Sequence, residues 1–242
     1  KNMIHPVLAR IEGDPAGTKG ISIFLVPKYL IDPKAPDKIG AYNDVVCSGI
    51  EHKMGITASA TCTMSFGDEG KCKGYLMGQE RQGMKIMFQM MNEARLYVGS
   101  QGMSVSSAAY MHAVTYARNR VQGADVTQML NPDAPQVTII NHPDVKRMLI
   151  SMKSKVEAMR TLTYYCALLE DLTHVEEGEA KNEAQGLLDF LIPICKAGNT
   201  DTAWEVTGDA IQVYGGYGFC SDYPVEQFAR DAKILQIYEG TN

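Results

Sequence analysis

Residues 212–242 read QVYGGYGFCSDYPVEQFARDAKILQIYEGTN, and this stretch decides how the rest of the chain is interpreted. It holds a cluster of glycines, a Tyr-Pro pair that can start a helix, an Arg-Asp pair, and Glu239 between large apolar residues and Gly240. Loss of water strengthens a carboxylate as a base, and a glycine lets a ligand approach the main chain closely. Glu239 is therefore a candidate general base. Pattern alone also allows a simpler interpretation, in which Glu239 ends a helix and Gly240 caps it.

Four segments of this stretch resemble the C-terminal signature of the FAD-dependent acyl-CoA dehydrogenases, in the same order and at the same spacing. They are the Gln-x-x-Gly-Gly-x-Gly-Phe turn from Gln212, the Tyr-Pro-x-Glu segment from Tyr223, the Arg-Asp-x-Lys segment from Arg230, and Ile-Tyr-Glu-Gly-Thr from Ile237. A glycine turn alone is weak evidence, whereas four matched segments within so short a stretch are specific.

The resemblance implies α,β-desaturation of an acyl-CoA thioester to the trans-2-enoyl-CoA. Glu239 would remove the pro-R α-proton while a hydride leaves Cβ for N5 of the flavin. The thioester oxygen would be stabilised by the Glu239 main-chain N–H and a ribityl hydroxyl. Expulsion of water when substrate binds would match the base to this task. FAD is the implied cofactor, and electron-transfer flavoprotein is the implied electron acceptor.

The glycine turn is implied to bind the cofactor. Gln212, Gly215 and Gly216 would place amide groups at the adenosine-pyrophosphate end of FAD, since glycines allow close approach to phosphate. Thr241 would lie near the FAD as well. The alternative for the glycines is a tight turn between two helices.

Arg120 lies within a segment, Tyr116–Gly123, that resembles the end of the corresponding helix in the family. In the family an arginine here reaches the FAD pyrophosphate of a neighbouring subunit, and a guanidinium fits phosphate as a bidentate fork. A homodimer or homotetramer that shares FAD across its interface is therefore implied. Gln122 stands where the family has an aromatic residue, which puts that contact in doubt. A solvated arginine at a helix end is the alternative for Arg120.

Substrate contacts are implied for Arg95, Tyr238 and Gly240. The segment Asn92–Arg95 resembles an acidic-x-x-Arg segment that faces the CoA moiety, although Asn92 replaces the acidic residue. Arg95 lies on a mostly apolar helix face, where an unpaired guanidinium is costly, so a structural salt bridge is the alternative. Tyr238 would lie beside the acyl pocket.

The first part of the chain predicts an antiparallel sheet, because short apolar runs alternate with Gly, Pro and Asp. Part of it, His52–Thr61, resembles the "Lys-x-Gly-x-x-x-Ser-x-Thr" stretch of the middle β domain of the family. The predicted strands are 7–11, 20–27, 44–53, 60–67 and 71–76.

From Gly83 the apolar spacing changes to three and four residues, which predicts amphipathic helices. The first should run to about Arg120, the second from Pro143 to about Val175, and the third from about 186 to 214, with a kink or a late start because of Pro193. Residues 124–141 and 176–182 are predicted loops. The expected fold class is α+β, with a partial antiparallel β-sheet domain followed by an up-down α-helical bundle.

The resemblance assigns residues 1–78 to the remainder of a middle β domain and 79–242 to a truncated C-terminal helical domain. The N-terminal helical domain of the family is absent, so we expect this piece alone to bind FAD poorly and to be inactive. The HPDVKRML wording from His142 and the long preceding loop resemble a branch with longer chains, which includes methylthiopropanoyl-CoA dehydrogenase-like members.

Composition limits the partners. The net charge of −5 argues against a nucleic-acid or acidic-membrane surface. No apolar run is long enough to span a bilayer, and no metal site is expected. The bacterial cytoplasm is favoured, and the mitochondrial matrix is also compatible. Two alternative functions stay open: an acyl-CoA oxidase-like or alkylation-response flavoprotein with the same fold, and a flavin-free helical scaffold or interaction protein.

Overall fold

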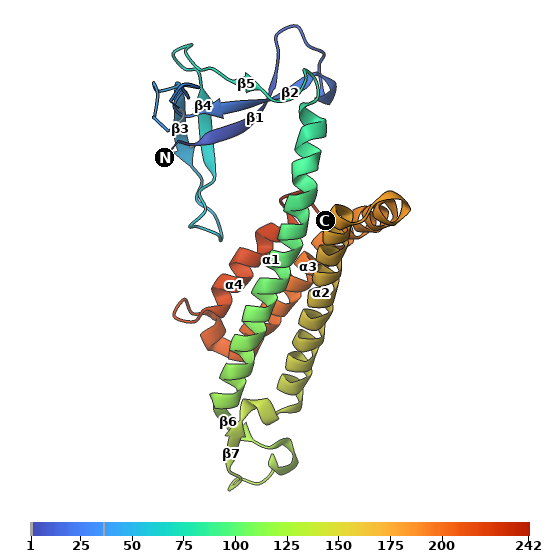
Figure 1. The fold of residues 1–242 in the computed structure, drawn as a ribbon. Coiled ribbons are helices and arrows are strands. Elements are labelled where there is room, and N and C mark those ends of the chain that lie inside the picture. Colours follow the sequence, from blue (N-terminus) through green and yellow to red (C-terminus); the bar gives the residue numbers. More distant parts are fainter. Residues whose placement is uncertain (1, 36) are drawn as a thin grey trace. The chain divides into compact units, whose positions relative to one another are not determined.

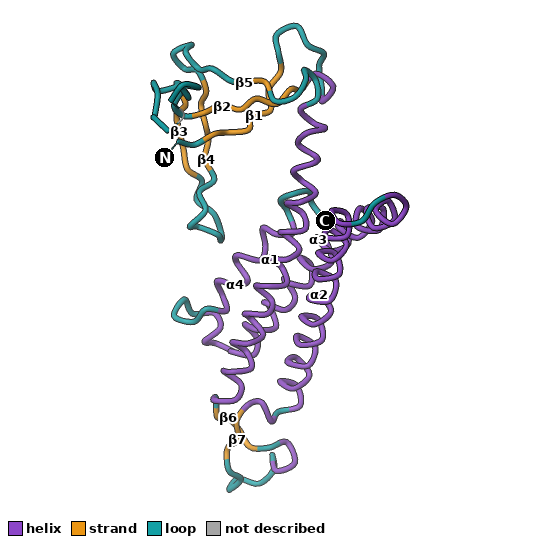
Figure 2. The backbone as a smooth tube through the Cα atoms, viewed as in Figure 1, coloured by secondary structure: helices purple, strands orange, loops and turns teal. Residues whose placement is uncertain are grey.

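The computed structural model describes residues 2–35 and 37–242. The chain forms two compact units, Lys1–Lys53 with Thr57–Asn92, and Met54–Ile56 with Glu93–Asn242. Antiparallel strands are the main regular elements of the first unit and long helices make up most of the second, so the predicted α+β class is confirmed (Figures 1 and 2). The assignment of residues 1–78 and 79–242 to two domains of a longer protein stays a prediction, and residues 1 and 36 within it lie outside the described residues.

The first unit contains the five strands that the apolar runs predict. β1 (Ile4–Arg10) alternates between exposed and half-buried residues and pairs along its whole length with β2 (Ile21–Pro27). A short strand, β5 (Tyr75–Leu76), pairs with the other edge of β2. β3 (Val45–Ile50) and β4 (Cys62–Phe66) form a separate antiparallel pair with a bulge. The first strand begins at Ile4 rather than at the predicted position 7.

The second unit is an up-down arrangement of long helices. It contains the part of α1 (Gly83–Asn119) that begins at Glu93, followed by α2 (Pro143–Val175), α3 (Gly178–Tyr214) and α4 (Val225–Lys233). Short 3-10 turns follow the last two helices, η4 (Gly215–Phe219) after α3 and η5 (Ile234–Gln236) after α4. Figure 1 shows α1, α2, α3 and α4 running side by side.

Two predicted loops differ from the structure. α3 begins at Gly178, so only Glu176 and Glu177 separate it from α2, and Pro193 lies inside one continuous helix. Acidic residues such as Glu179 favour a helix N-terminus because they oppose the helix dipole, which is why this polar stretch is helical. The predicted loop 124–141 includes part of a ribbon, β6 (Val121–Ala124) with β7 (Gln136–Thr138), and two 3-10 turns, η2 (Val126–Gln128) and η3 (Ile139–Asn141).

Small residues let α1 lie close to α3. A side chain added at Gly102 would place its Cβ 3.0 Å from the Asn199 main-chain oxygen, and one at Gly99 would meet Cys195 Sγ at 3.0 Å. The same face of α1 continues with buried small residues, namely Ser106, Ala109, Ala113 and Ala117. This close approach brings the polar groups of α3 within reach of those at the start of the α1 segment.

Candidate functional site

Glu239 lies in an irregular segment that follows the last helix. α4 ends at Lys233 and η5 at Gln236, so the interpretation of Glu239 as the end of a helix is wrong. Glu239 itself has φ 55°, and Gly240 follows with φ 94°. The left-handed region costs a non-glycine residue about 1–2 kcal/mol, so contacts from elsewhere must hold this conformation.

Two cationic side chains supply such contacts. Arg95 of α1 donates from Nε to the Glu239 main-chain oxygen at 3.1 Å. Lys196 of α3 donates from Nζ to the Gly240 main-chain oxygen and, at 2.7 Å, to Asn242 Oδ1. Both cations therefore bind the main chain around Glu239 and not its carboxylate. The salt bridge considered for Arg95 is replaced by a hydrogen bond to a carbonyl.

The Glu239 segment keeps groups available for a ligand. The carboxylate is half-buried, and within residues 2–35 and 37–242 no cation lies within ion-pair distance of it. In the same described part, neither the N–H of Glu239 nor that of Gly240 donates to another main-chain group. A carboxylate beside two unused N–H donors can accept a proton while the donors stabilise a developing negative charge.

Tyr238 and Thr241, which flank the Glu239–Gly240 pair in the sequence, are held by hydrogen bonds beside Glu239. The hydroxyl of Tyr238 donates to Gln101 Oε1 at 2.6 Å, and burial together with the charge of Glu239 raises the pKa of Tyr238. The Thr241 hydroxyl donates to the Ile237 main-chain oxygen at 3.4 Å. Thr241 thus lies with the candidate base and apart from the other residues predicted to bind FAD.

The other residues that the sequence assigned to FAD lie together at the C-terminal end of α3. Gly215 follows Lys196 by 19 positions, which corresponds to roughly 28 Å along a helix. Here a hollow of about 570 Å³ opens beside the glycine turn, and its lining includes Arg120, Gln212, Gly215 and Gly216, all four of which were assigned to the cofactor from the sequence. Its remaining lining residues are Tyr116, Gln122, Ile139, His142, Asp144, Val145, Met148, Val213, Tyr214, Tyr217 and Cys220.

The three glycines of the turn differ in whether the fold requires them. Gly215 has φ 61°, a conformation that other residues adopt only with strain. A Cβ at Gly218 would lie 2.4 Å from the Ile211 main-chain oxygen, so packing within the chain excludes a side chain there. Gly216 has no such φ, and a Cβ there would meet nothing within 4 Å. Packing within this chain therefore does not require a glycine at position 216.

Aromatic rings and a cation line the same hollow. Tyr116 stacks on Tyr214 with ring centroids 4.0 Å apart, and the Arg120 guanidinium lies 5.4 Å from the Tyr217 ring centroid. Burial raises the pKa of Tyr116, so its hydroxyl stays neutral. A guanidinium, open glycine main chain and flat aromatic surface suit a ligand with a diphosphate and a planar base, which are the features of the FAD adenosine end.

Sequence reasoning missed some residues of both places. In the hollow, the missed residue is His142, whose Nε2–H donates to the Gln122 main-chain oxygen at 2.7 Å. Gln122 is the residue that stands where the family has an aromatic side chain. Beside Glu239, the missed residues are Gln101 and Lys196. Lys196 carried a usable signal, since it is a single lysine in the apolar run LLDFLIPICKAG, but its partner Gly240 could not be read from that run.

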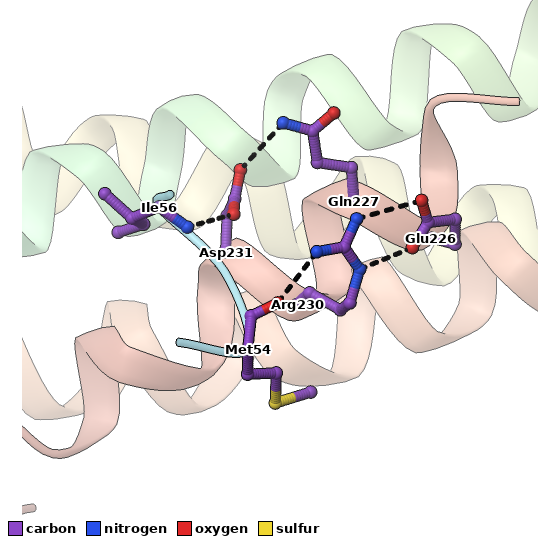
Figure 3. A network of polar contacts seen from close by, with 6 residues as sticks. All are labelled: Met54, Ile56, Glu226, Gln227, Arg230 and Asp231. Atoms are coloured by element: carbon purple, nitrogen blue, oxygen red, sulfur yellow. Dashed lines mark hydrogen bonds and ion pairs between the residues drawn. The ribbon is translucent and has the colours of Figure 1, made fainter. Parts of the chain in front are cut away.

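The Arg-Asp pair of α4 has a structural task. Arg230 Nη1 donates to the Met54 main-chain oxygen at 2.7 Å, and Asp231 Oδ1 accepts from the Ile56 N–H at 2.6 Å (Figure 3). Glu226 holds the Arg230 guanidinium through two hydrogen bonds, and this contact lowers the pKa of Glu226. The segment 54–56 is therefore bound to α4 at both of its ends, through Met54 and through Ile56.

Gly55 sits between these two contacts, and we expect Gly55→Ala to displace residues 54–56. Its Cβ would lie 2.6 Å from the main-chain oxygen of Arg230 and from Asp231 Oδ1, which is a clash with backbone. Overpacking of this kind costs about 1–3 kcal/mol. Hydrogen exchange should show lost protection at Ile56, with a lower Tm. Gly49→Ala is the control, because its Cβ would meet Thr63 at an ordinary 3.8 Å. Equal behaviour of the two variants would contradict the expectation.

Among residues 2–35 and 37–242, no group of three or more His, Cys, Asp or Glu side chains is arranged to hold a metal ion. No helix in that part of the chain is long and apolar enough to cross a membrane.

Several known proteins are similar to this chain in sequence and in structure. The family profile described as "Acyl-CoA dehydrogenase, C-terminal domain" matches residues 81–242. The whole chain is 42% identical to a broad-specificity linear acyl-CoA dehydrogenase of Mycobacterium tuberculosis and 41% identical to 3-methylmercaptopropionyl-CoA dehydrogenase of Ruegeria pomeroyi, and it spans 40% of the length of each. Butyryl-CoA dehydrogenase from Megasphaera elsdenii has a similar structure, with a TM-score of 0.73 and 29% identity over 99% of this chain and 53% of that one.

Proposed function

The chain belongs to the acyl-CoA dehydrogenase family, and from that premise we propose that it is part of an enzyme that desaturates an acyl-CoA thioester between Cα and Cβ. The observation that carries the proposal is the arrangement around Glu239: Arg95 holds its main-chain oxygen and Lys196 holds that of Gly240, and within the described residues the carboxylate and N–H of Glu239 are left for substrate. Because the chain spans only 40% of the length of these relatives, the reaction is proposed for the full-length protein.

In this proposal Glu239 takes the α-proton of the thioester onto its carboxylate. The α-proton is only weakly acidic, so the thioester oxygen needs a donor as negative charge develops on it. The Glu239 main-chain N–H supplies that donor from the same residue. Arg95 and Lys196 keep the carboxylate and the N–H in a fixed relation by holding the main-chain carbonyls of Glu239 and Gly240, respectively.

The family is FAD-dependent, and the hollow beside the glycine turn fits the adenosine-pyrophosphate end of that cofactor. We assign Arg120 to the pyrophosphate, with Gln212, Gly215 and Gly216 beside it, and Thr241 to the region of the flavin. FAD, when bound, supplies the acceptor for the hydride that leaves Cβ. Electron-transfer flavoprotein is the proposed acceptor of the electrons thereafter.

The distance between the two places supports a shared cofactor. Glu239 and the glycine turn lie near positions of α3 that are roughly 28 Å apart along the helix. That span exceeds the distance from the flavin ring to the pyrophosphate within one FAD. We therefore propose a homodimer or homotetramer in which the hollow of one subunit holds the FAD that serves Glu239 of its neighbour.

The substrate is proposed to be a linear acyl-CoA. Tyr238, fixed by its hydrogen bond to Gln101, forms a wall of the acyl pocket, and Arg95 and Gly240 lie at the thioester end. The two relatives named above differ in substrate, so chain length is left to experiment. Their bacterial origin favours the bacterial cytoplasm over the mitochondrial matrix. We further propose that residues 1–78 and 79–242 correspond to the middle β and C-terminal helical domains, with an N-terminal helical domain in the full-length protein.

The full-length parent, purified with FAD, tests the proposal. A panel of linear acyl-CoAs is added without oxygen while the visible absorbance of the flavin is followed. We expect bleaching with at least one thioester and formation of the enoyl-CoA. A protein without flavin, or a flavin that no thioester bleaches, would favour the scaffold interpretation. Rapid peroxide release in air would instead identify an acyl-CoA oxidase-like relative.

A further inference from the structure

Lys196 is a charged side chain in a place where charges are rare. It lies within α3, beside the buried Cys195, and is only 4% exposed. Burial lowers the pKa of Lys196, because loss of water disfavours the ammonium, while the charge of Asp201 acts in the opposite direction. A buried ammonium is costly unless hydrogen bonds compensate for the lost water, so the partners of Lys196 indicate why it is there.

Those partners belong to the segment that follows Glu239. Nζ of Lys196 donates to the Gly240 main-chain oxygen and, at 2.7 Å, to Asn242 Oδ1. The Asn242 side-chain amide in turn donates to Thr200 Oγ1 at 2.7 Å and to Asp201 Oδ1 at 2.8 Å. Lys196, Thr200 and Asp201 are four and five positions apart, so one face of α3 binds the segment at successive turns.

The segment needs such binding because its conformation is strained. Glu239 adopts φ 55°, three residues after the 3-10 turn η5 ends at Gln236 and directly before a glycine at φ 94°. On the other side, Arg95 holds the Glu239 main-chain oxygen. Without the α3 contacts, rotation about the main-chain single bonds of Glu239 and Gly240 could move the carboxylate and the adjacent N–H groups.

We propose that Lys196 is a positioning residue for Glu239, and that it fixes the direction of the carboxylate by binding the main chain of Gly240 and the side chain of Asn242. The inference rests on the proposed role of Glu239 as the base. Lys196 acts only through this segment and makes no contact with substrate. A displacement of a catalytic group by about 1 Å can cost about 100-fold in rate, so the effect of losing Lys196 should fall on the chemical step.

The test uses the full-length, FAD-loaded protein and Lys196→Met, which keeps the length of the side chain and removes its donors. We expect the rate of flavin reduction at saturating acyl-CoA to fall by roughly 30–100-fold. FAD content and the Kd of the thioester should stay within about threefold, which separates positioning from a general loss of structure. Hydrogen exchange of the peptide over residues 236–242 should become faster.

Lys155→Met is the matched control. Lys155 also lies in the helical unit, where it pairs with the exposed Glu205 of α3 at 2.8 Å. Asn242→Leu is a second variant in case Lys196→Met does not fold. It removes one acceptor of the ammonium at an exposed residue, and we expect a smaller fall in the rate of flavin reduction with the same faster exchange.

The outcomes distinguish this inference from the proposed function. Wild-type reduction rates in folded Lys196→Met and Asn242→Leu, or losses of equal size in rate, Kd and FAD content, would overturn the positioning role. If wild type reacts with no thioester, the proposed function fails, and the exchange comparison alone decides whether Lys196 holds the segment. Unchanged exchange in both variants would then refute it.

Discussion

Glu239→Gln should abolish most of the flavin reduction by acyl-CoA in the full-length protein. Glutamine keeps the size and the main-chain preferences of glutamate, so the hydrogen bonds from Arg95 and Lys196 to main-chain oxygens remain available. What is lost is the proton acceptor, and general base catalysis contributes about 10²–10⁴-fold. We expect the reduction rate to fall by that factor, measured by stopped-flow absorbance without oxygen, while the thioester still binds.

Glu205→Gln provides a control for the loss of a carboxylate. Glu205 lies on the exposed side of α3, with its side chain 61% accessible, and it takes no part in the proposed site. Its variant should reduce flavin at the wild-type rate. Bleaching at equal rates in Glu239→Gln and wild type would leave the family assignment intact and would show that another group removes the α-proton.

Gly216→Val should strip the protein of FAD without destabilising the polypeptide. A Cβ at Gly216 meets nothing within 4 Å, and its φ is not one that requires glycine. Valine would instead fill the space that the pyrophosphate is proposed to occupy. Hydrogen bonds to charged groups are worth about 1.5–3 kcal/mol, which corresponds to an increase of about 10–100-fold in the Kd for FAD.

Two measurements test this expectation: titration of the apoprotein with FAD, and the Tm of the FAD-free protein, which should be unchanged. Gly186→Val is the control, since Gly186 also lies in the α3 region with open space around its Cβ. A Gly216→Val protein that binds FAD normally but loses its oligomeric state would mean that the open side of Gly216 faces a partner subunit.

Local pattern predicted most of the fold. The strands of the first unit and the helices from Gly83 and Pro143 follow from the spacing of apolar residues, which reflects the burial of one face. The prediction was wrong where polar residues and a proline were taken as helix breakers. Polar residues at 176–182 suggested a loop, yet a helix N-terminus favours acidic residues. Pro193 suggested a kink or a late start, yet α3 begins before the proline and continues past it.

For the candidate site, the sequence indicated the residues that lie in short local motifs, but not the contacts between distant parts of the chain. The glycine turn predicts that a ligand can approach the main chain closely. Which glycine is open to a ligand depends on contacts within the fold, such as the one between Gly218 and Ile211, and on the open space beside Gly216. The same holds for the hydrogen bond between Ile56 and Asp231, whose residues are 175 positions apart. Lys196 and Gly240 are 44 positions apart, and no spacing rule connects them.

Glu239 lies beside the middle of α3 and the glycine turn lies at its C-terminal end, and this placement has a consequence for mixed assemblies. If each catalytic centre takes its base from one subunit and its cofactor cradle from the next, then damage beside the middle of α3 and damage at its C-terminal end are complementary. A dimer that combines a subunit without the base and a subunit without the cradle contains one centre with both defects and one centre with neither. The activity of such a mixture is then a property of pairing, and two inactive chains together can form an active enzyme.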